Sequence, residues 1–198
     1  MTPFPGKIVV GITGGIACGK STVCKKFEIY GWQAISTDSC SHYILENNDD
    51  IKHQIFTRFG DSIKDANGSV DKTKLGGVVF KSSKDRAWLE HLMHPLVRSH
   101  WMSLVDNSTN NKIVVEVPLL FENNLHALFT KTICVYSSED VQCSRLIERG
   151  MKISEIESRM KIQMKTSEKA ERANYVILTD GELDSTYQQI DQFLKYFN

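Results

Sequence analysis

The chain has 198 residues, enough for one domain with an insertion and a core of ordinary size. Its 24 basic and 24 acidic side chains balance, which argues against the broad positive field of proteins that bind nucleic acid or anionic membranes. No apolar run approaches the roughly 18 residues of a spanning helix, and no signal-peptide core precedes the first strand, so we expect a soluble, cytoplasmic protein.

The first predicted element is a buried strand that runs into a glycine-rich turn. Residues 8–12 are apolar, and residues 14–21 read GGIACGKS, which has the spacing GxxxxGK[ST]. In this pattern backbone N–H groups converge on a polyphosphate, Lys20 reaches the β and γ phosphates, and the Ser21 hydroxyl can ligate Mg²⁺. A glycine-rich turn without a ligand does not explain the Lys-Ser pair. The residues predicted to bind the nucleotide are Gly14, Gly15, Ile16, Ala17, Cys18, Gly19, Lys20, Ser21 and Thr22.

The rest of the chain alternates strands with helices, apart from one long helical stretch from residue 39 to about 106. Within that stretch we predict a helix over 43–59, a turn at 65–68, and then further helices. The remaining strands are predicted at 32–36, 112–117, 132–136 and 175–178. The remaining helices are predicted at 21–30, from 139 to about 173, and at the C-terminal end, where Leu183, Tyr187, Ile190 and Leu194 form an apolar face.

This alternation indicates the α/β class, with a parallel sheet covered by helices and ligands at the carboxyl ends of its strands. Asp38 follows the second strand and therefore lies on the same edge as the glycine-rich turn. An aspartate there can align an attacking hydroxyl and accept its proton, or hold a magnesium-bound water. The alternative role is to cap the next helix. We favour the catalytic role because of the position beside the turn.

Each of the other polar residues has two alternative roles. Glu116, at the end of the third strand, can reach a metal through water or pair with a Lys or Arg. His94 can contact a substrate or pack within its helix. Arg145, Arg149 and Arg159 suit the stabilisation of a γ-phosphate by a mobile segment, but they also fit an ordinary solvated helix face.

The five cysteines are odd in number, scattered, and never spaced as CxxC, which disfavours disulfide frameworks and zinc sites. We expect reduced, packed thiols. Cys18 is the candidate exception, because it lies at a helix N-terminus, where a thiolate is favoured.

The motifs along almost the whole chain resemble those of the dephospho-CoA kinase family. The glycine-rich turn extends to TGGIACGKS, which begins at Thr13. The long helical stretch ends in HPLV at 94–97, and VPLLFE follows at 117–122. Smaller matches are Phe59-Gly60, Asn67-Gly68, Asp71-Lys72, Leu75, Val79-Phe80, Gln142, Arg145-Leu146, Arg149, Arg159 and Gln163-Met164.

The resemblance implies a three-layer P-loop kinase fold with a five-stranded parallel sheet. Residues 1–38, 112–140 and 174–198 would form the nucleotide-binding core. Residues 39–111 would form a helical insertion that binds dephospho-CoA, and residues 141–173 a lid.

The resemblance also implies a reaction, the Mg²⁺-assisted transfer of the γ-phosphoryl group of ATP to the ribose 3′-hydroxyl of dephospho-CoA. Asp38, Lys20 and Arg149 would be catalytic. The substrate partners would be ATP and dephospho-CoA, with no nucleic acid or membrane partner. The residues implied to bind the acceptor are Asp38, Lys72, His94, Pro95, Leu119 and Glu122.

The chain departs from the family pattern at three places. The family usually has two aspartates one residue apart after the second strand, whereas this chain has Ser36 and Asp38. Lys72 stands where an arginine is common, and residues 174–181 match the usual ADYVIxNxG only in part. Two other functions stay open: another P-loop kinase of small molecules or nucleoside monophosphates, or a nucleotide-dependent switch. No N/T-K-x-D motif follows a strand, which counts against a GTPase.

Overall fold

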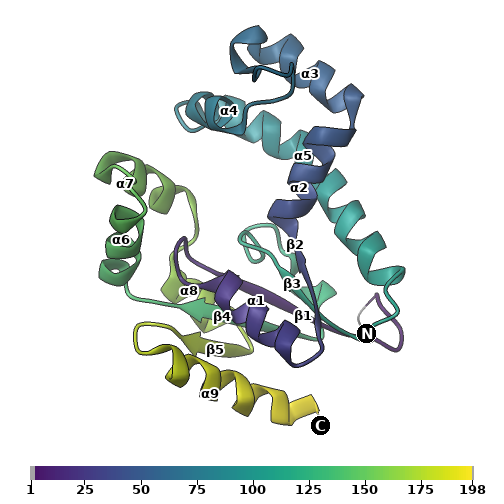
Figure 1. The fold of residues 1–198 in the computed structure, drawn as a ribbon, viewed down its shortest axis with the longest axis vertical. Coiled ribbons are helices and arrows are strands. Elements are labelled where there is room, and N and C mark those ends of the chain that lie inside the picture. Colours follow the sequence, from purple (N-terminus) through teal and green to yellow (C-terminus); the bar gives the residue numbers. More distant parts are fainter. Residues whose placement is uncertain (1–2, 198) are drawn as a thin grey trace. The chain divides into compact units, whose positions relative to one another are not determined.

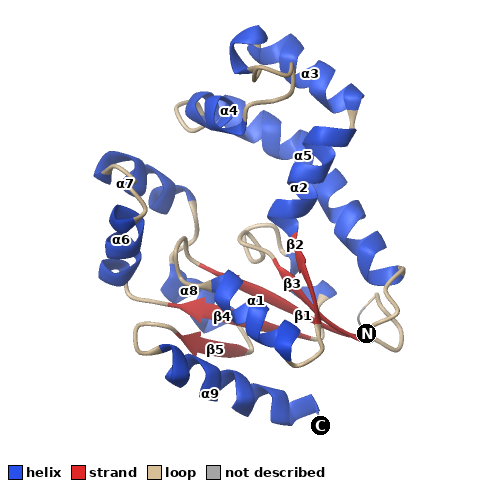
Figure 2. Ribbon diagram, viewed as in Figure 1, coloured by secondary structure: helices blue, strands red, loops and turns tan. Residues whose placement is uncertain are grey.

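Five parallel strands form one sheet within residues 3–197, the part of the chain that this computed structural model describes. The strand order is β2-β3-β1-β4-β5, so the first strand lies in the middle (Figure 2). The strands are β1 (Ile8–Gly14), β2 (Gln33–Ser36), β3 (Lys112–Glu116), β4 (Lys131–Tyr136) and β5 (Tyr175–Leu178). The predicted α/β class and parallel sheet are confirmed, and each strand lies within two residues of its predicted position.

Helices cover both faces of this sheet. Alternate residues of a strand point to opposite faces. Val10 and Ile12 of β1 pack into a core with Phe27 of α1 (Lys20–Ile29) and Phe193 of α9 (Leu183–Leu194). On the other face, a Cβ added at Gly11 would lie 2.7 Å from the Leu120 side chain, and α8 (Thr166–Arg172) contacts β1 and β4. The sheet is therefore the middle of three layers.

The chain divides into two compact units (Figure 1). The sheet unit comprises the residues up to Ser36 and those from Val105 onward, and it also contains α6 (Glu139–Glu148) and α7 (Ile153–Ile162). The helical unit, Thr37–Leu104, contains α2 (Thr37–Asn47), α3 (Asp49–Phe59), α4 (Lys72–Val79) and most of α5 (Ser83–Asp106). It has a core of its own, in which Ile55, Ile63, Leu75 and Met93 are buried.

The predicted helix over 43–59 is wrong in one respect, because it is broken at Asn48 into α2 and α3. The Asn48 side chain accepts a hydrogen bond from the Ile51 N–H at 3.1 Å, and its backbone is extended. Asparagine favours this N-cap geometry over a helix interior. None of the described helices is long and apolar enough to cross a membrane.

Candidate active site

The phosphate loop connects β1 to α1 and needs unusual backbone conformations. Gly14 has φ +148°, and a Cβ there would lie 2.2 Å from the Val135 carbonyl oxygen, so only glycine fits beside β4. Gly19 (φ +84°) precedes α1 and occupies the left-handed region. Ala17 also has a positive φ, of 60°. Non-glycine residues persist in this region when their surroundings hold them there.

Lys20 lies over its own loop. Its Nζ donates to the Gly15 carbonyl at 2.8 Å and to the Gly14 carbonyl at 3.3 Å. The next residues, Ser21 and Thr22, are exposed in the first turn of α1. The structure therefore presents an ammonium, a hydroxyl and a helix N-terminus at one place, which is an arrangement suited to an anion.

Cys18 does not fit the expectation of a reactive thiol. Its side chain is fully buried, and its Sγ accepts a hydrogen bond from the Ser137 Oγ at 3.2 Å. Burial raises the pKa of the Cys134 thiol to about 12. Burial also raises the pKa of Cys24, with the Glu116 charge acting in the same direction. Cys24 and Cys134 are therefore packed and protonated at neutral pH.

The arginines predicted to reach a phosphate differ in their surroundings. Arg149 is exposed at the end of α6, directly before Gly150, which has φ +81°. Arg145, one turn earlier, contacts the phosphate loop itself, since its Nη1 donates to the Ala17 carbonyl at 3.1 Å. Arg159 lies on α7 and pairs with Glu155 at 2.8 Å. This i,i+4 ion pair fits the alternative role, in which Arg159 belongs to an ordinary solvated helix face.

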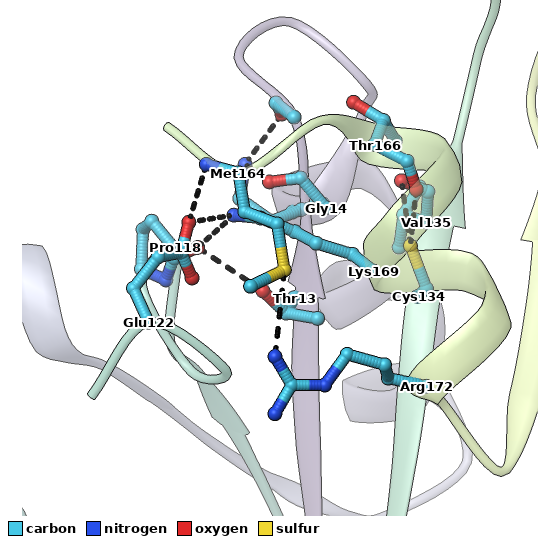
Figure 3. A network of polar contacts seen from close by, with 12 residues as sticks. Thr13, Gly14, Pro118, Glu122, Cys134, Val135, Met164, Thr166, Lys169 and Arg172 are labelled. Carbon is cyan, nitrogen blue, oxygen red and sulfur yellow. Dashed lines mark hydrogen bonds and ion pairs between the residues drawn. The ribbon is translucent and has the colours of Figure 1, made fainter. Parts of the chain in front are cut away.

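The corner after β3 is held by a buried ion pair that sequence reasoning missed (Figure 3). The Lys169 side chain is fully buried; its Nζ lies 2.8 Å from the Glu122 Oε1 and donates to the Pro118 carbonyl at 2.6 Å. Glu122 Oε1 also accepts from the Met164 N–H at 3.0 Å. Thr13 Oγ1 donates to the same Pro118 carbonyl at 3.1 Å. In sequence, Lys169 looks like one more charge on a polar helix, so no local signal marks it.

Glu122 is thus committed to protein partners through one oxygen. Its other oxygen, Oε2, is buried and has no hydrogen-bond partner among the described residues. Leu119, on the same corner, is half-buried, and its carbonyl accepts from the Asn123 N–H at 3.2 Å. Glu116 ends β3, where it pairs in register with Ile12 of β1 and Ser36 of β2.

In the helical unit, Asp38 is exposed in the first turn of α2. The helix already begins at Thr37, so Asp38 does not occupy the N-cap position that was the alternative to a catalytic role.

Lys72 begins α4, and Asp71 caps that helix by accepting from the Thr73 N–H at 2.9 Å. Burial lowers the pKa of the Lys72 ammonium, and the Asp38 carboxylate acts in the opposite direction. Asp38 and Lys72 therefore lie within electrostatic reach of each other.

His94 and Pro95 lie together in the middle of α5. Burial lowers the pKa of His94 below its ordinary 6.5, although the Glu90 charge opposes this shift. The imidazole is therefore neutral at pH 7 and can both donate and accept a hydrogen bond. Pro95 has no N–H, so α5 lacks one backbone hydrogen bond at this point.

The predicted residues fall into two groups. The phosphate loop, Glu116, Leu119, Glu122 and the lid arginines belong to the sheet unit, and Asp38, Lys72, His94 and Pro95 belong to the helical unit.

Comparison with known proteins places these features in one family. A family model described as dephospho-CoA kinase (CoaE) matches residues 8–185. A dephospho-CoA kinase of Oceanobacillus iheyensis is 36% identical over 196 residues, covering 96% of this chain and 98% of the relative. One of Arabidopsis thaliana is 35% identical over 190 residues, covering 94% of this chain and 82% of the relative.

Solved structures give the same result. The dephospho-CoA kinase from Campylobacter jejuni superposes with a TM-score of 0.68 at 25% identity, covering 96% of both chains. The protein TT1252 from Thermus thermophilus reaches a TM-score of 0.82 at 26% identity, covering 97% of this chain and 98% of that chain. A shikimate kinase from Acinetobacter baumannii shares the fold alone, with a TM-score of 0.53 at 11% identity, covering 96% of this chain and 93% of that chain.

Proposed function

This chain belongs to the dephospho-CoA kinase family, and we propose that it transfers the γ-phosphoryl group of ATP to the ribose 3′-hydroxyl of dephospho-CoA. The products are coenzyme A and ADP, and the reaction is the last step of coenzyme A biosynthesis. The observation that carries this function is the phosphate loop at the carboxyl end of β1, within a chain that matches the family over residues 8–185. In this proposal the reaction takes place in the cytoplasm.

The sheet unit binds ATP. Backbone N–H groups of residues 14–19 surround the phosphates, and α1 adds its positive N-terminal dipole. Lys20 exchanges its bonds to the Gly14 and Gly15 carbonyls for bonds to the β and γ phosphates. Because these groups are in place before the substrate arrives, little reorganisation is needed at the moment of transfer.

The residues of the loop fit a magnesium ion shared with ATP. Ser21 offers one exposed hydroxyl oxygen, a hard ligand of the kind that Mg²⁺ prefers. The described residues contain no group of three or more His, Cys, Asp or Glu side chains able to hold an ion alone. The remaining ligands would be phosphate oxygens and water, as is usual for Mg²⁺ in kinases. An ion held there would supply positive charge that offsets the charge developing on the transferred group.

Asp38 orients the attacking 3′-hydroxyl. It is exposed, and Thr37 alone separates it from Ser36 at the end of β2. Ser36 pairs with Glu116, which in turn pairs with Ile12 shortly before the phosphate loop. A carboxylate is a weak base toward an alcohol, so alignment of the hydroxyl contributes more than full removal of its proton. With Ser36 in place of the usual first aspartate, Asp38 does this without a second carboxylate.

The acceptor is recognised by the helical unit and by the corner after β3. Lys72 offers a cation beside Asp38, and the neutral His94 next to Pro95 offers a donor and an acceptor. Leu119 is the half-buried apolar contact of the corner. Glu122 keeps the corner in place through Lys169 and Met164.

Residues 141–173 form the lid in this proposal, and residues 39–111 the acceptor-binding insertion. Arg149 is exposed at the end of α6, followed by the turn at Gly150, from which it can cover charge on the γ-phosphate. Closure of such a lid excludes water and limits the hydrolysis of ATP.

The test is an assay of ADP release in which dephospho-CoA is compared with a panel of nucleoside monophosphate and sugar acceptors. We expect ADP release that depends on dephospho-CoA, with coenzyme A as the second product. Preference for another acceptor would make the chain a different P-loop kinase. Nucleotide binding without transfer to any acceptor would make it a switch.

A further inference from the structure

We infer that Thr179 and Arg145 are positioning residues of the phosphate loop, and that they hold the carbonyl groups of Cys18 and Ala17 so that the loop is shaped for phosphate before ATP binds. The inference rests on the proposed nucleotide site. It concerns the contacts between the phosphate loop and the rest of the protein. The GxxxxGK[ST] motif does not specify the residues that make these contacts.

Thr179 supports the loop from the end of β5. Its side chain is buried, and its Oγ1 donates to the Cys18 carbonyl at 2.9 Å. The same hydroxyl lies 3.2 Å from the Tyr136 carbonyl, while the Thr179 N–H donates to that carbonyl at 2.9 Å. Since the backbone already satisfies Tyr136, the single hydroxyl proton is available to Cys18. The Thr179 methyl group lies 3.9 Å from the position of a Cβ added at Gly19, so the side chain packs directly against the loop.

Arg145 supports the loop from α6. Its Nη1 donates to the Ala17 carbonyl at 3.1 Å and lies 3.4 Å from the Thr179 Oγ1. Its Nη2 donates to the Thr179 carbonyl. One guanidinium therefore links the loop to the segment after β5, and it does so with the rigid fork that lysine lacks.

The segment after β5 is itself fixed. The Asp180 carboxylate accepts from the Ser138 N–H at 3.0 and 3.2 Å, at the start of α6. The segment after β5 and the start of α6 are thus joined to each other outside the loop, and Thr179 and Arg145, which is bound to the Thr179 carbonyl, can impose a shape on the loop.

The two carbonyl groups matter because a trans peptide points its C=O and the next N–H in opposite directions. Fixing the Cys18 carbonyl on Thr179 directs the Gly19 N–H away from Thr179. Fixing the Ala17 carbonyl on Arg145 stabilises a residue whose φ of 60° is unfavourable for alanine. The Cys18 N–H then closes the turn on the Gly15 carbonyl at 3.4 Å. Without the two side chains, part of the binding energy of ATP would be spent on forming this turn.

The experiment measures the binding of two separate parts of ATP, tripolyphosphate and adenosine, by isothermal titration calorimetry. We expect Thr179→Val and Arg145→Met to bind tripolyphosphate roughly tenfold more weakly than the wild type, as the loss of an orienting hydrogen bond allows. Adenosine binding should stay within about twofold. Thr179→Ser keeps the hydroxyl and should bind tripolyphosphate like the wild type.

Thr186→Val is the matched control. The Thr186 hydroxyl is also buried and also donates to a backbone carbonyl, that of Leu178, at 3.3 Å, but it does not touch the loop. This variant should lose a similar amount of thermal stability and keep its tripolyphosphate affinity.

Wild-type affinity for tripolyphosphate in Thr179→Val or Arg145→Met would overturn the inference, as would an equal loss of adenosine and tripolyphosphate binding. If Thr179→Val does not fold, the tripolyphosphate affinities of Arg145→Met and Thr179→Ser test the inference instead. Failure of the wild type to bind tripolyphosphate would instead contradict the nucleotide site on which the inference rests.

Discussion

Two adjacent glycines of the phosphate loop have different neighbours. A Cβ added at Gly14 would lie 2.2 Å from a backbone oxygen, that of Val135. A Cβ added at Gly15 would lie 2.3 Å from the Thr166 Oγ1 and 2.5 Å from the Gln142 Oε1, which are the ends of side chains. A side chain can rotate away, whereas a strand of the sheet cannot.

We therefore expect Gly14→Ala to be the more harmful substitution. It should lower the free energy of unfolding by more than about 3 kcal/mol, because it adds backbone strain at φ +148° to the clash. Gly15→Ala should cost about 1–2 kcal/mol. Urea unfolding followed by circular dichroism measures both losses, and equal losses would show that the strand yields as easily as the side chains.

A second prediction at this scale concerns Asp38. Asp38→Asn keeps the shape of the side chain but loses the negative charge that aligns the hydroxyl and accepts its proton, so turnover should fall by roughly 100-fold or more while ATP affinity is unchanged. Asp50, also exposed in the first turn of its helix, provides the control Asp50→Asn, which should keep normal turnover. Steady-state kinetics and ATP titration give the two quantities. Near-normal turnover in Asp38→Asn would remove this residue from the reaction.

Among the helices, α8 is short but makes an ion pair through a buried lysine. It has seven residues, yet its Lys169 is fully buried and pairs with Glu122 in the corner after β3. If the lysine were removed, the partly buried Glu122 carboxylate would be left without its cation, and this is more costly than the loss of an exposed pair.

Lys169→Met should accordingly reduce the free energy of unfolding by about 3–5 kcal/mol. The double variant Lys169→Met with Glu122→Gln should lose less than the sum of the two single losses, because neither charge is left alone. Lys161→Met, on an exposed position of α7, should cost less than about 0.5 kcal/mol. Chemical unfolding of the wild type and the four variants tests this, and strictly additive losses would argue against a coupled pair.

The helices and strands also show which structural features can be predicted from the sequence. The strands and the phosphate loop are readable because apolar runs and the GxxxxGK[ST] spacing are local patterns. The break at Asn48 was missed, although the signal exists: an asparagine followed by two aspartates is a helix start.

Other features have no local signal. The bonds from Lys169 to Pro118 and from Thr179 to Cys18 join residues 51 and 161 positions apart in sequence. Only the packing of α8 and β5 beside β4 and β1 brings such partners together. A buried lysine and a buried threonine therefore look, in sequence, like surface residues of a helix and a loop.

At the scale of the whole molecule, buried thiols contribute to how stability responds to alkaline pH. Burial raises the pKa of Cys134 from 9.0 to about 12 in the folded state. Below pH 9 the thiol is neutral whether the chain is folded or not, so this contribution to stability is fully present. Above pH 9 the unfolded chain loses the proton and the folded chain keeps it, so the contribution is lost as the pH rises toward 12.

We expect the free energy of unfolding to fall as the pH rises above 9. Ionisation of the Cys134 thiol in the unfolded chain contributes up to about 1.4 kcal/mol per pH unit to this slope. Cys134→Ala should have a correspondingly shallower slope between pH 10 and 11. Urea unfolding at several pH values measures the slopes. Parallel slopes in the two proteins would mean that the folded thiol ionises as easily as the unfolded one.

The hydrogen bond between Thr179 and Cys18 joins the first part of the chain to nearly the last. During synthesis the motif leaves the ribosome before β5, so its support follows only when β5 has emerged and joined the edge of the sheet beside β4. A nascent chain that lacks the last strand would carry the complete GxxxxGK[ST] signature and still bind nucleotide poorly. ATP binding would then report that the whole sheet is finished, and cellular ATP would stabilise completed molecules over truncated ones.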